Sequence, residues 1–116
     1  MTRGPRPHRA LSEAVTLALL RGTVQMAGAG PESLYDFTIV SAVPVVFVRV
    51  KFAARILAPL PEIIAEFRDA ILRLRSIPQD AAISRELWLR SKHGTWRLFR
   101  IAADSLTELG RDGRPL

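Results

Sequence analysis

Hydrophobic residues recur with a period of two in the middle of the chain, where residues 45–52 read VVFVRVKF. This spacing, together with the β-branched residues in the run, predicts a strand whose side chains alternate between two faces. One face would carry apolar side chains alone: Val46, Val48, Val50 and Phe52. The other would mix apolar with cationic side chains: Val45, Phe47, Arg49 and Lys51.

Two other stretches have the spacing of an amphipathic helix. The first runs from His8 to Arg21 and ends at Gly22. The second follows Pro59 and Pro61, which suit a first helical turn, and is closed by Pro78. Its apolar stripe consists of Ile63, Ile64, Phe67, Ala70, Ile71 and Leu74.

Four short segments complete the predicted sheet: Thr23–Ala27, Asp36–Val40, Glu86–Ser91 and Thr95–Ile101. The last two would form a hairpin around His93-Gly94. A two-residue turn would set Arg90 opposite Arg97, an unfavourable pair unless an anion such as a phosphate lies between them. A three-residue turn would change this register.

The chain of 116 residues predicts one domain, with a basic arm at residues 1–8, an α/β domain at 9–109 and a flexible tail at 110–116. It contains no cysteine, so a disulfide framework and a zinc-thiolate site are excluded. No signal peptide is evident, and the longest apolar run, Val43–Val48, is too short to span a bilayer. A cytoplasmic protein without a membrane partner is expected.

The formal net charge of +6 favours a polyanionic partner, because neutralising phosphates supplies much of the affinity for nucleic acid. All cations but Lys51 and Lys92 are arginines, a bias that a GC-rich genome would also produce. Trp88 and Trp96 could stack on bases or pack in the core. His8 and His93 lie far apart in sequence and are expected to be solvated.

Four features occur in a suggestive order: Glu13 in the first helix, Gly28 and Gly30 in a loop, Asp36 at the start of a strand, and Lys51 at the end of the next. This order resembles the PD-(D/E)XK, or restriction-endonuclease-like, nuclease superfamily, and within it the archaeal Holliday junction resolvases. The resemblance implies the element order helix, strand, strand, strand, helix. It also implies an α/β core with a small mixed sheet of about four to five strands flanked by two helices.

By this resemblance Glu13, Asp36 and Lys51 match the catalytic residues, with the two acids holding Mg²⁺ and the lysine steadying the attacking water or the developing charge. The family, however, has a second acid two residues before the lysine, where this chain has Arg49, and a proline where it has Tyr35. Arg49 would repel a metal and pair with Asp36. The site is therefore expected to be degenerate, with weak metal binding at most.

Each residue also has a structural interpretation: Glu13 would favour the positive end of its helix, Asp36 would be a turn carboxylate and Lys51 a solvated strand end. Our first hypothesis is a non-catalytic nucleic-acid-binding protein, with DNA favoured over RNA. The DNA would lie across Asp36, Arg49 and Lys51. Further phosphate contacts would come from Arg90, Lys92, Arg97 and the arm residues Arg3, Arg6 and Arg9.

Two alternatives stay open. One is an active Mg²⁺-dependent endonuclease in which another acid, such as Glu32, completes the site. The other is a small interaction module that pairs through the 45–52 strand or the hairpin. A homodimer is compatible with each of the three hypotheses.

Overall fold

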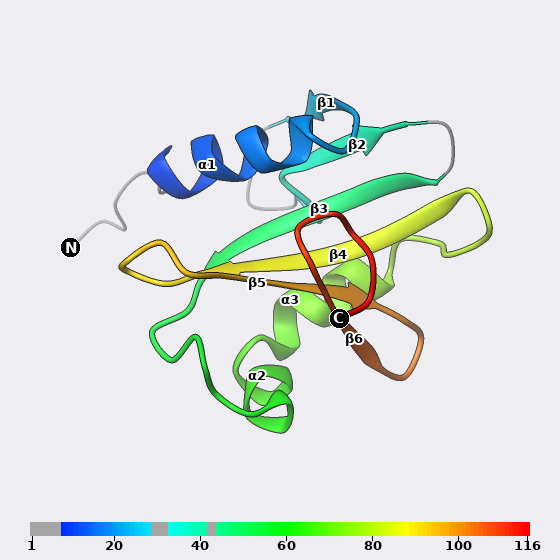
Figure 1. Cartoon of the computed structure of the whole chain (residues 1–116). Coiled ribbons are helices and arrows are strands. Elements are labelled where there is room, and N and C mark those ends of the chain that lie inside the picture. Colours follow the sequence, from blue (N-terminus) through cyan, green and yellow to red (C-terminus); the bar gives the residue numbers. More distant parts are fainter. Residues whose placement is uncertain (1–7, 29–32, 42–43) are drawn as a thin grey trace.

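The alternating segments assemble into a single mixed sheet between helices in a computed structural model, which describes residues 8–28, 33–41 and 44–116 (Figure 1). The strands are β1 (Thr23–Met26), β2 (Phe37–Val40), β3 (Val45–Phe52), β4 (Ile83–Arg90), β5 (Trp96–Ile101) and β6 (Leu106–Leu109). The helices are α1 (His8–Leu19), α2 (Leu60–Glu66) and α3 (Arg68–Arg75).

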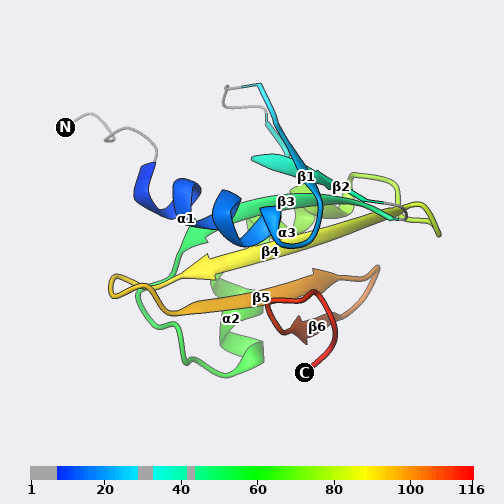
Figure 2. The same cartoon turned by 45° about the horizontal axis from the view of Figure 1, so that its top comes forward.

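Strand order in the sheet follows the chain, from β1 at one edge to β6 at the other. Only β3 and β4 are parallel, and every other neighbouring pair is antiparallel. A parallel pair requires a crossover connection, which α2 and α3 supply. Figures 1 and 2 show α1 on one face of the sheet and α2 with α3 on the other. The predicted α/β class with a mixed sheet is confirmed, although the described sheet has six strands.

Two hydrophobic clusters lie on the two faces. The α1 face buries Phe37, Ile39, Val46, Val48, Trp88 and Leu98 with Ala14 and Ala18. The other face packs Leu87, Leu89, Phe99 and Ile101 against Ile63, Phe67, Ile71 and Leu74. The alternation predicted for residues 45–52 is confirmed, since Val46 and Val48 face α1 whereas Phe47 packs on the opposite cluster.

The second predicted helix is divided into two. The backbone of Phe67 leaves the helical region, with φ −104° and ψ 24°, so α2 ends before it and α3 begins after it. Its N–H still bonds to Ile63 and its carbonyl to Ile71, so the apolar stripe keeps its phase and Ile63, Phe67 and Ile71 are all buried. None of the helices in the described ranges is long and apolar enough to cross a bilayer.

The hairpin between β4 and β5 has the three-residue turn. The N–H of Ser91 bonds to the carbonyl of Thr95, which leaves residues 92–94 as the loop, with Gly94 at φ +87°. Arg90 is therefore opposite Trp96, and Arg97 is opposite Leu89. The two arginines are not cross-strand neighbours, so the suggested phosphate between them loses its basis.

The C-terminal residues differ from the expected loose tail. Residues 110–116 fold back on the sheet, where the N–H of Leu116 bonds to Glu108 and the carbonyl of Gly113 accepts a hydrogen bond from Arg100. The tail thus follows β6, a strand that the sequence patterns did not predict. Residues 1–7 of the predicted arm lie outside the described ranges, and α1 begins at His8.

Candidate nucleic-acid interface

Asp36, which directly precedes β2, forms an ion pair with Arg49 of β3. Arg49 Nη1 donates to Asp36 Oδ1 at 3.3 Å, and the backbone N–H of Val50 donates to Oδ2 at 2.7 Å. The guanidinium of Arg49 also bonds to the carbonyl of Ser33. Both oxygens of the predicted metal ligand Asp36 are therefore already bonded by donors of the protein.

This pair is largely withdrawn from solvent, with side-chain exposures of 12% for Arg49 and 6% for Asp36. The Nε of Arg49 is buried and has no hydrogen-bond partner within the described residues. The predicted pairing of Arg49 with Asp36 is thus present, but the guanidinium faces protein groups. Lys51, the predicted catalytic lysine, lies two residues further along β3 and is exposed.

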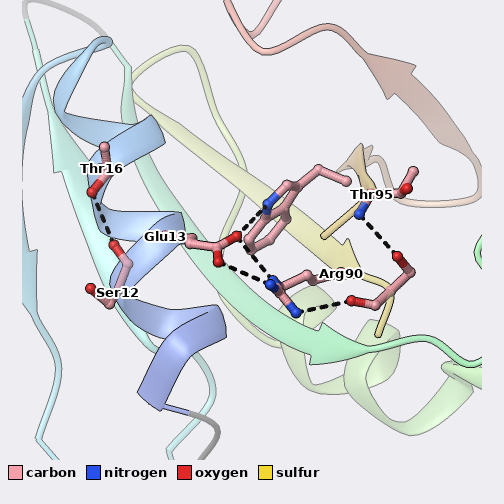
Figure 3. Close-up of polar contacts among 7 residues, drawn as sticks. Ser12, Glu13, Thr16, Arg90 and Thr95 are labelled. Carbon is pink, nitrogen blue, oxygen red and sulfur yellow. Dashed lines mark hydrogen bonds and ion pairs between the residues drawn. The ribbon is translucent and has the colours of Figure 1, made fainter. Parts of the chain in front are cut away.

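Glu13 is engaged elsewhere, between α1 and the β4–β5 hairpin (Figure 3). Arg90 donates to both of its oxygens, from Nε at 3.0 Å and from Nη2 at 2.9 Å. The indole N–H of Trp96 donates to Glu13 at 3.4 Å. A bidentate arginine–carboxylate contact of this kind fixes orientation as well as charge, so it locks α1 onto the hairpin.

The hydrogen bonds from Arg90 lower the pKa of Glu13, with smaller contributions from the charge of Arg90, from Trp96 and from Arg9, against a desolvation that raises it. The same contact raises the pKa of Arg90. Both groups are therefore held in their charged forms at neutral pH. Glu13 acts here as the counter-ion of Arg90.

The two acids that match catalytic residues of the nuclease superfamily thus belong to separate ion pairs. Asp36 is bonded to groups of β3, whereas Glu13 is bonded to side chains of β4 and β5. Nowhere in the described ranges do three or more His, Cys, Asp or Glu side chains gather in a way that could hold a metal ion. Gly30 and Glu32, which were expected in the loop and in an alternative site, lie outside those ranges.

Arg97 is the third arginine that was expected to bind nucleic acid, and it too is held by protein groups. It makes a bidentate contact with Glu108 at 2.8 and 3.0 Å, which raises the pKa of Arg97. Its Nη1 also donates to the carbonyls of Ile56 and Ala58. Arg97 therefore anchors the loop between β3 and α2 to the sheet.

Exposed cations remain at the end of the sheet where these paired arginines hold the elements together. Here the start of α1, the end of β3, the β3–α2 loop and the β4–β5 hairpin lie side by side (Figures 1 and 2, left). We call this region the hairpin end. Its exposed cations are Arg9, Lys51, Arg55 and Lys92.

The acids near the exposed cations of the hairpin end are paired with arginines, as Glu108 is with Arg97. Glu13 is paired with Arg90, and Glu62 is paired at 2.6 Å with Arg55 in a contact that is open to water. The turns at the opposite end of the sheet, before β4 and after β5, carry the exposed acids Asp80 and Asp104. Among these exposed residues the charge is therefore asymmetric along the strands, with cations in excess at the hairpin end and acids at the other.

One buried ion pair escaped the sequence patterns. Glu86, fully buried on β4, accepts hydrogen bonds from both terminal nitrogens of Arg21 at 2.8 and 2.9 Å and from the indole of Trp88 at 2.9 Å. Burial lowers the pKa of Arg21, but the hydrogen bonds and charge of Glu86 outweigh it and raise the pKa overall. Trp88 is accordingly a core residue, and Trp96 packs against the same cluster.

No protein family, curated protein or solved structure matches this chain. The candidate interface therefore stands on the geometry described above.

Proposed function

We propose that this protein binds nucleic acid through the hairpin end and does so without catalysis. The observation that carries the proposal is the charge asymmetry along the sheet. Arg9, Lys51 and Lys92 are exposed at one end, while exposed acids lie at the other. Such a distribution orients the molecule toward a polyanion and gives affinity through phosphate neutralisation.

The paired arginines support this function indirectly. Arg90 ties α1 to the hairpin, and Arg97 ties the β3–α2 loop to the sheet. The exposed cations thus stand on elements whose relative positions are fixed, which lowers the entropic cost of binding. Of the eight cations that the sequence suggested for contacts with nucleic acid, Arg9, Lys51 and Lys92 keep this role in the proposal, and Arg3 and Arg6 lie outside the described ranges.

The order of elements supports descent from a nuclease-like core. Helix, strand, strand, strand and helix occur in the order that the resemblance implies, with β3 and β4 parallel across the helical connection. In such a core Arg49 takes the place of a metal-binding acid and forms an ion pair with Asp36. The proposed core is restriction-endonuclease-like, with a degenerate site and no metal cofactor.

Fluorescence anisotropy tests the binding. Labelled duplex, four-way-junction DNA and RNA of matched length are titrated with protein at two salt concentrations. We expect affinity that falls steeply with salt, and a double variant Arg9→Ala/Lys92→Ala that reduces the salt slope on duplex DNA by about two. The matched control is Arg111→Ala/Arg114→Ala, which removes the same charge from the exposed tail. No binding at low salt, or equal losses in the two variants, would overturn the proposal.

Incubation of the same substrates with Mg²⁺ or Mn²⁺ tests the absence of catalysis. We expect every substrate to stay intact. Cleavage that disappears in Asp36→Ala would instead establish an active nuclease, and it would leave the binding proposal standing.

A further inference from the structure

An exposed aromatic side chain lies among the cations of the hairpin end. Phe52, the last residue of β3, has an exposure of 53%, whereas the other phenylalanines in the described ranges, Phe37, Phe47, Phe67 and Phe99, pack in the two clusters. Covering the exposed part of this ring with a ligand would remove apolar surface from water, which is favourable. A ring in this position therefore suits contact with a ligand.

The backbone around Phe52 is fixed. Phe52 is opposite Arg90 in the parallel ladder, and the N–H of the next residue, Ala53, donates to the Arg90 carbonyl at 2.9 Å. The ring is therefore presented by a rigid strand end. By the alternation of β3 it belongs to the face of Val48 and Val50, the face that α1 covers.

Exposed cations lie near this position. Lys51 precedes Phe52 in β3 and belongs to the opposite face of the strand, and Lys92 follows Arg90 by two residues at the tip of the hairpin. Arg9 lies in the first turn of α1, four residues before Glu13, which bonds to Arg90. An apolar ring flanked by exposed cations matches a nucleotide, whose base has a π-face and whose phosphates are anionic.

We propose that Phe52 is a stacking platform for an unpaired base, so that the hairpin end binds single-stranded nucleic acid or the unpaired part of a branched one. This inference rests on the proposed function and specifies its substrate. In a continuous duplex the faces of the bases are covered by their neighbours, so Phe52 can contribute there only at an end. Stacking is tolerant of sequence because every base has a π-face.

The experiment compares Phe52→Ala with wild type on a single-stranded oligonucleotide and on a continuous duplex long enough that its ends contribute little. We expect the single-strand affinity to fall about tenfold, in the range of a lost base–aromatic stack, and the duplex affinity to stay unchanged. Leu72→Ala is the matched control, because Leu72 is equally exposed, at 52%, but belongs to α3. It should leave both affinities at the wild-type value.

A second variant, Phe52→Trp, gives a direct readout. The tryptophan fluorescence of wild type comes from Trp88 and Trp96. Because the added indole at position 52 would stack on a base, we expect a bound single strand to quench the fluorescence of Phe52→Trp more than that of wild type. Single-strand binding that is insensitive to Phe52→Ala, with no added quenching in Phe52→Trp, would overturn the stacking role. If wild type binds no nucleic acid at low salt, the proposed function itself fails, and the two failures are thus distinguishable.

Discussion

In the proposed nuclease-like core, Arg49 occupies the position at which a metal-binding acid would complete a site with Asp36. In the structure its guanidinium forms a largely buried ion pair with Asp36 at 3.3 Å. An acid at this position would place two carboxylates side by side, an arrangement that favours either protonation or a bound divalent cation. The identity of this single side chain therefore separates a metal site from an ion pair.

Arg49→Glu tests this separation. Loss of the buried partner and the new like-charge contact should lower the free energy of unfolding by about 3 kcal/mol or more. Thermal unfolding in EDTA and in Mg²⁺ or Mn²⁺ measures the response. We expect the metal to raise the melting temperature of this variant and not that of Arg49→Gln, which lacks the new acid. Equal melting temperatures with and without metal would count against a nuclease-like ancestry of the site.

Glu13 makes stability depend on pH. Its pKa is lowered in the folded state, chiefly by the hydrogen bonds from Arg90. A group with a depressed folded pKa stabilises the protein above its unfolded pKa, and this contribution is lost as the pH falls through the folded value. The stability difference between wild type and Glu13→Gln should thus be present at neutral pH and vanish in acid below the ordinary glutamate range.

Urea denaturation at neutral and acidic pH measures this difference, with the exposed Glu66→Gln as the matched control. A difference for Glu13→Gln that is the same at both pH values would show that its charge does not matter to the fold.

At the scale of the element, the β4–β5 hairpin depends on one backbone conformation. Gly94 has φ +87°, a region that costs a side-chain-bearing residue roughly 1–2 kcal/mol. Its Cβ would meet the Arg90 guanidinium at 3.4 Å, an ordinary contact, so conformation dominates. Gly94→Ala should lower the unfolding free energy by that amount, measured by chemical denaturation. Gly28→Ala, where a Cβ would meet nothing within 4 Å, is the control, and an equal effect in both variants would refute the explanation.

Most elements were predictable because their burial follows a regular period. Val46 and Val48 are buried while Val45 and Phe47 are half-buried, and β3 has the predicted bounds. The strand β6 was hidden because its two buried residues, Leu106 and Leu109, are three positions apart and do not alternate. The break at Phe67 was hidden for the opposite reason, since the apolar stripe keeps helical spacing on both sides of it. A pattern of burial reports which side chains face the core, and it does not report local backbone distortions.

At the scale of the whole molecule, the sequence predicted the pairing of Arg49 with Asp36 but not the partners of the other charged residues of the candidate site. Arg90 and Glu13 are 77 positions apart, and Arg21 and Glu86 are 65 apart, so no local spacing could show that these charges pair. An arginine that neutralises a carboxylate and one that is exposed look alike in the sequence. Only the fold shows that Arg90 and Arg97 stabilise the framework, whereas Lys51 and Lys92 are exposed at its end.

The fold-back of residues 111–116 links the C-terminus to the buried charge of the sheet. Gly113 approaches the Arg21 guanidinium so closely that a Cβ there would lie 2.5 Å from Nη2, and the charge of Asp112 helps to raise the pKa of Arg21. The tail therefore shields the Arg21–Glu86 pair from water.

Ending the chain at Gly110 should lower the unfolding free energy by about 1–3 kcal/mol. Water would then reach the Arg21–Glu86 ion pair and weaken it, and Arg100 would lose its hydrogen bond to the Gly113 carbonyl. Urea denaturation measures the loss, with Arg114→Ala in the full-length chain as the control for tail charge. An unchanged unfolding free energy in the shortened chain would mean that the tail contributes nothing to the buried pair.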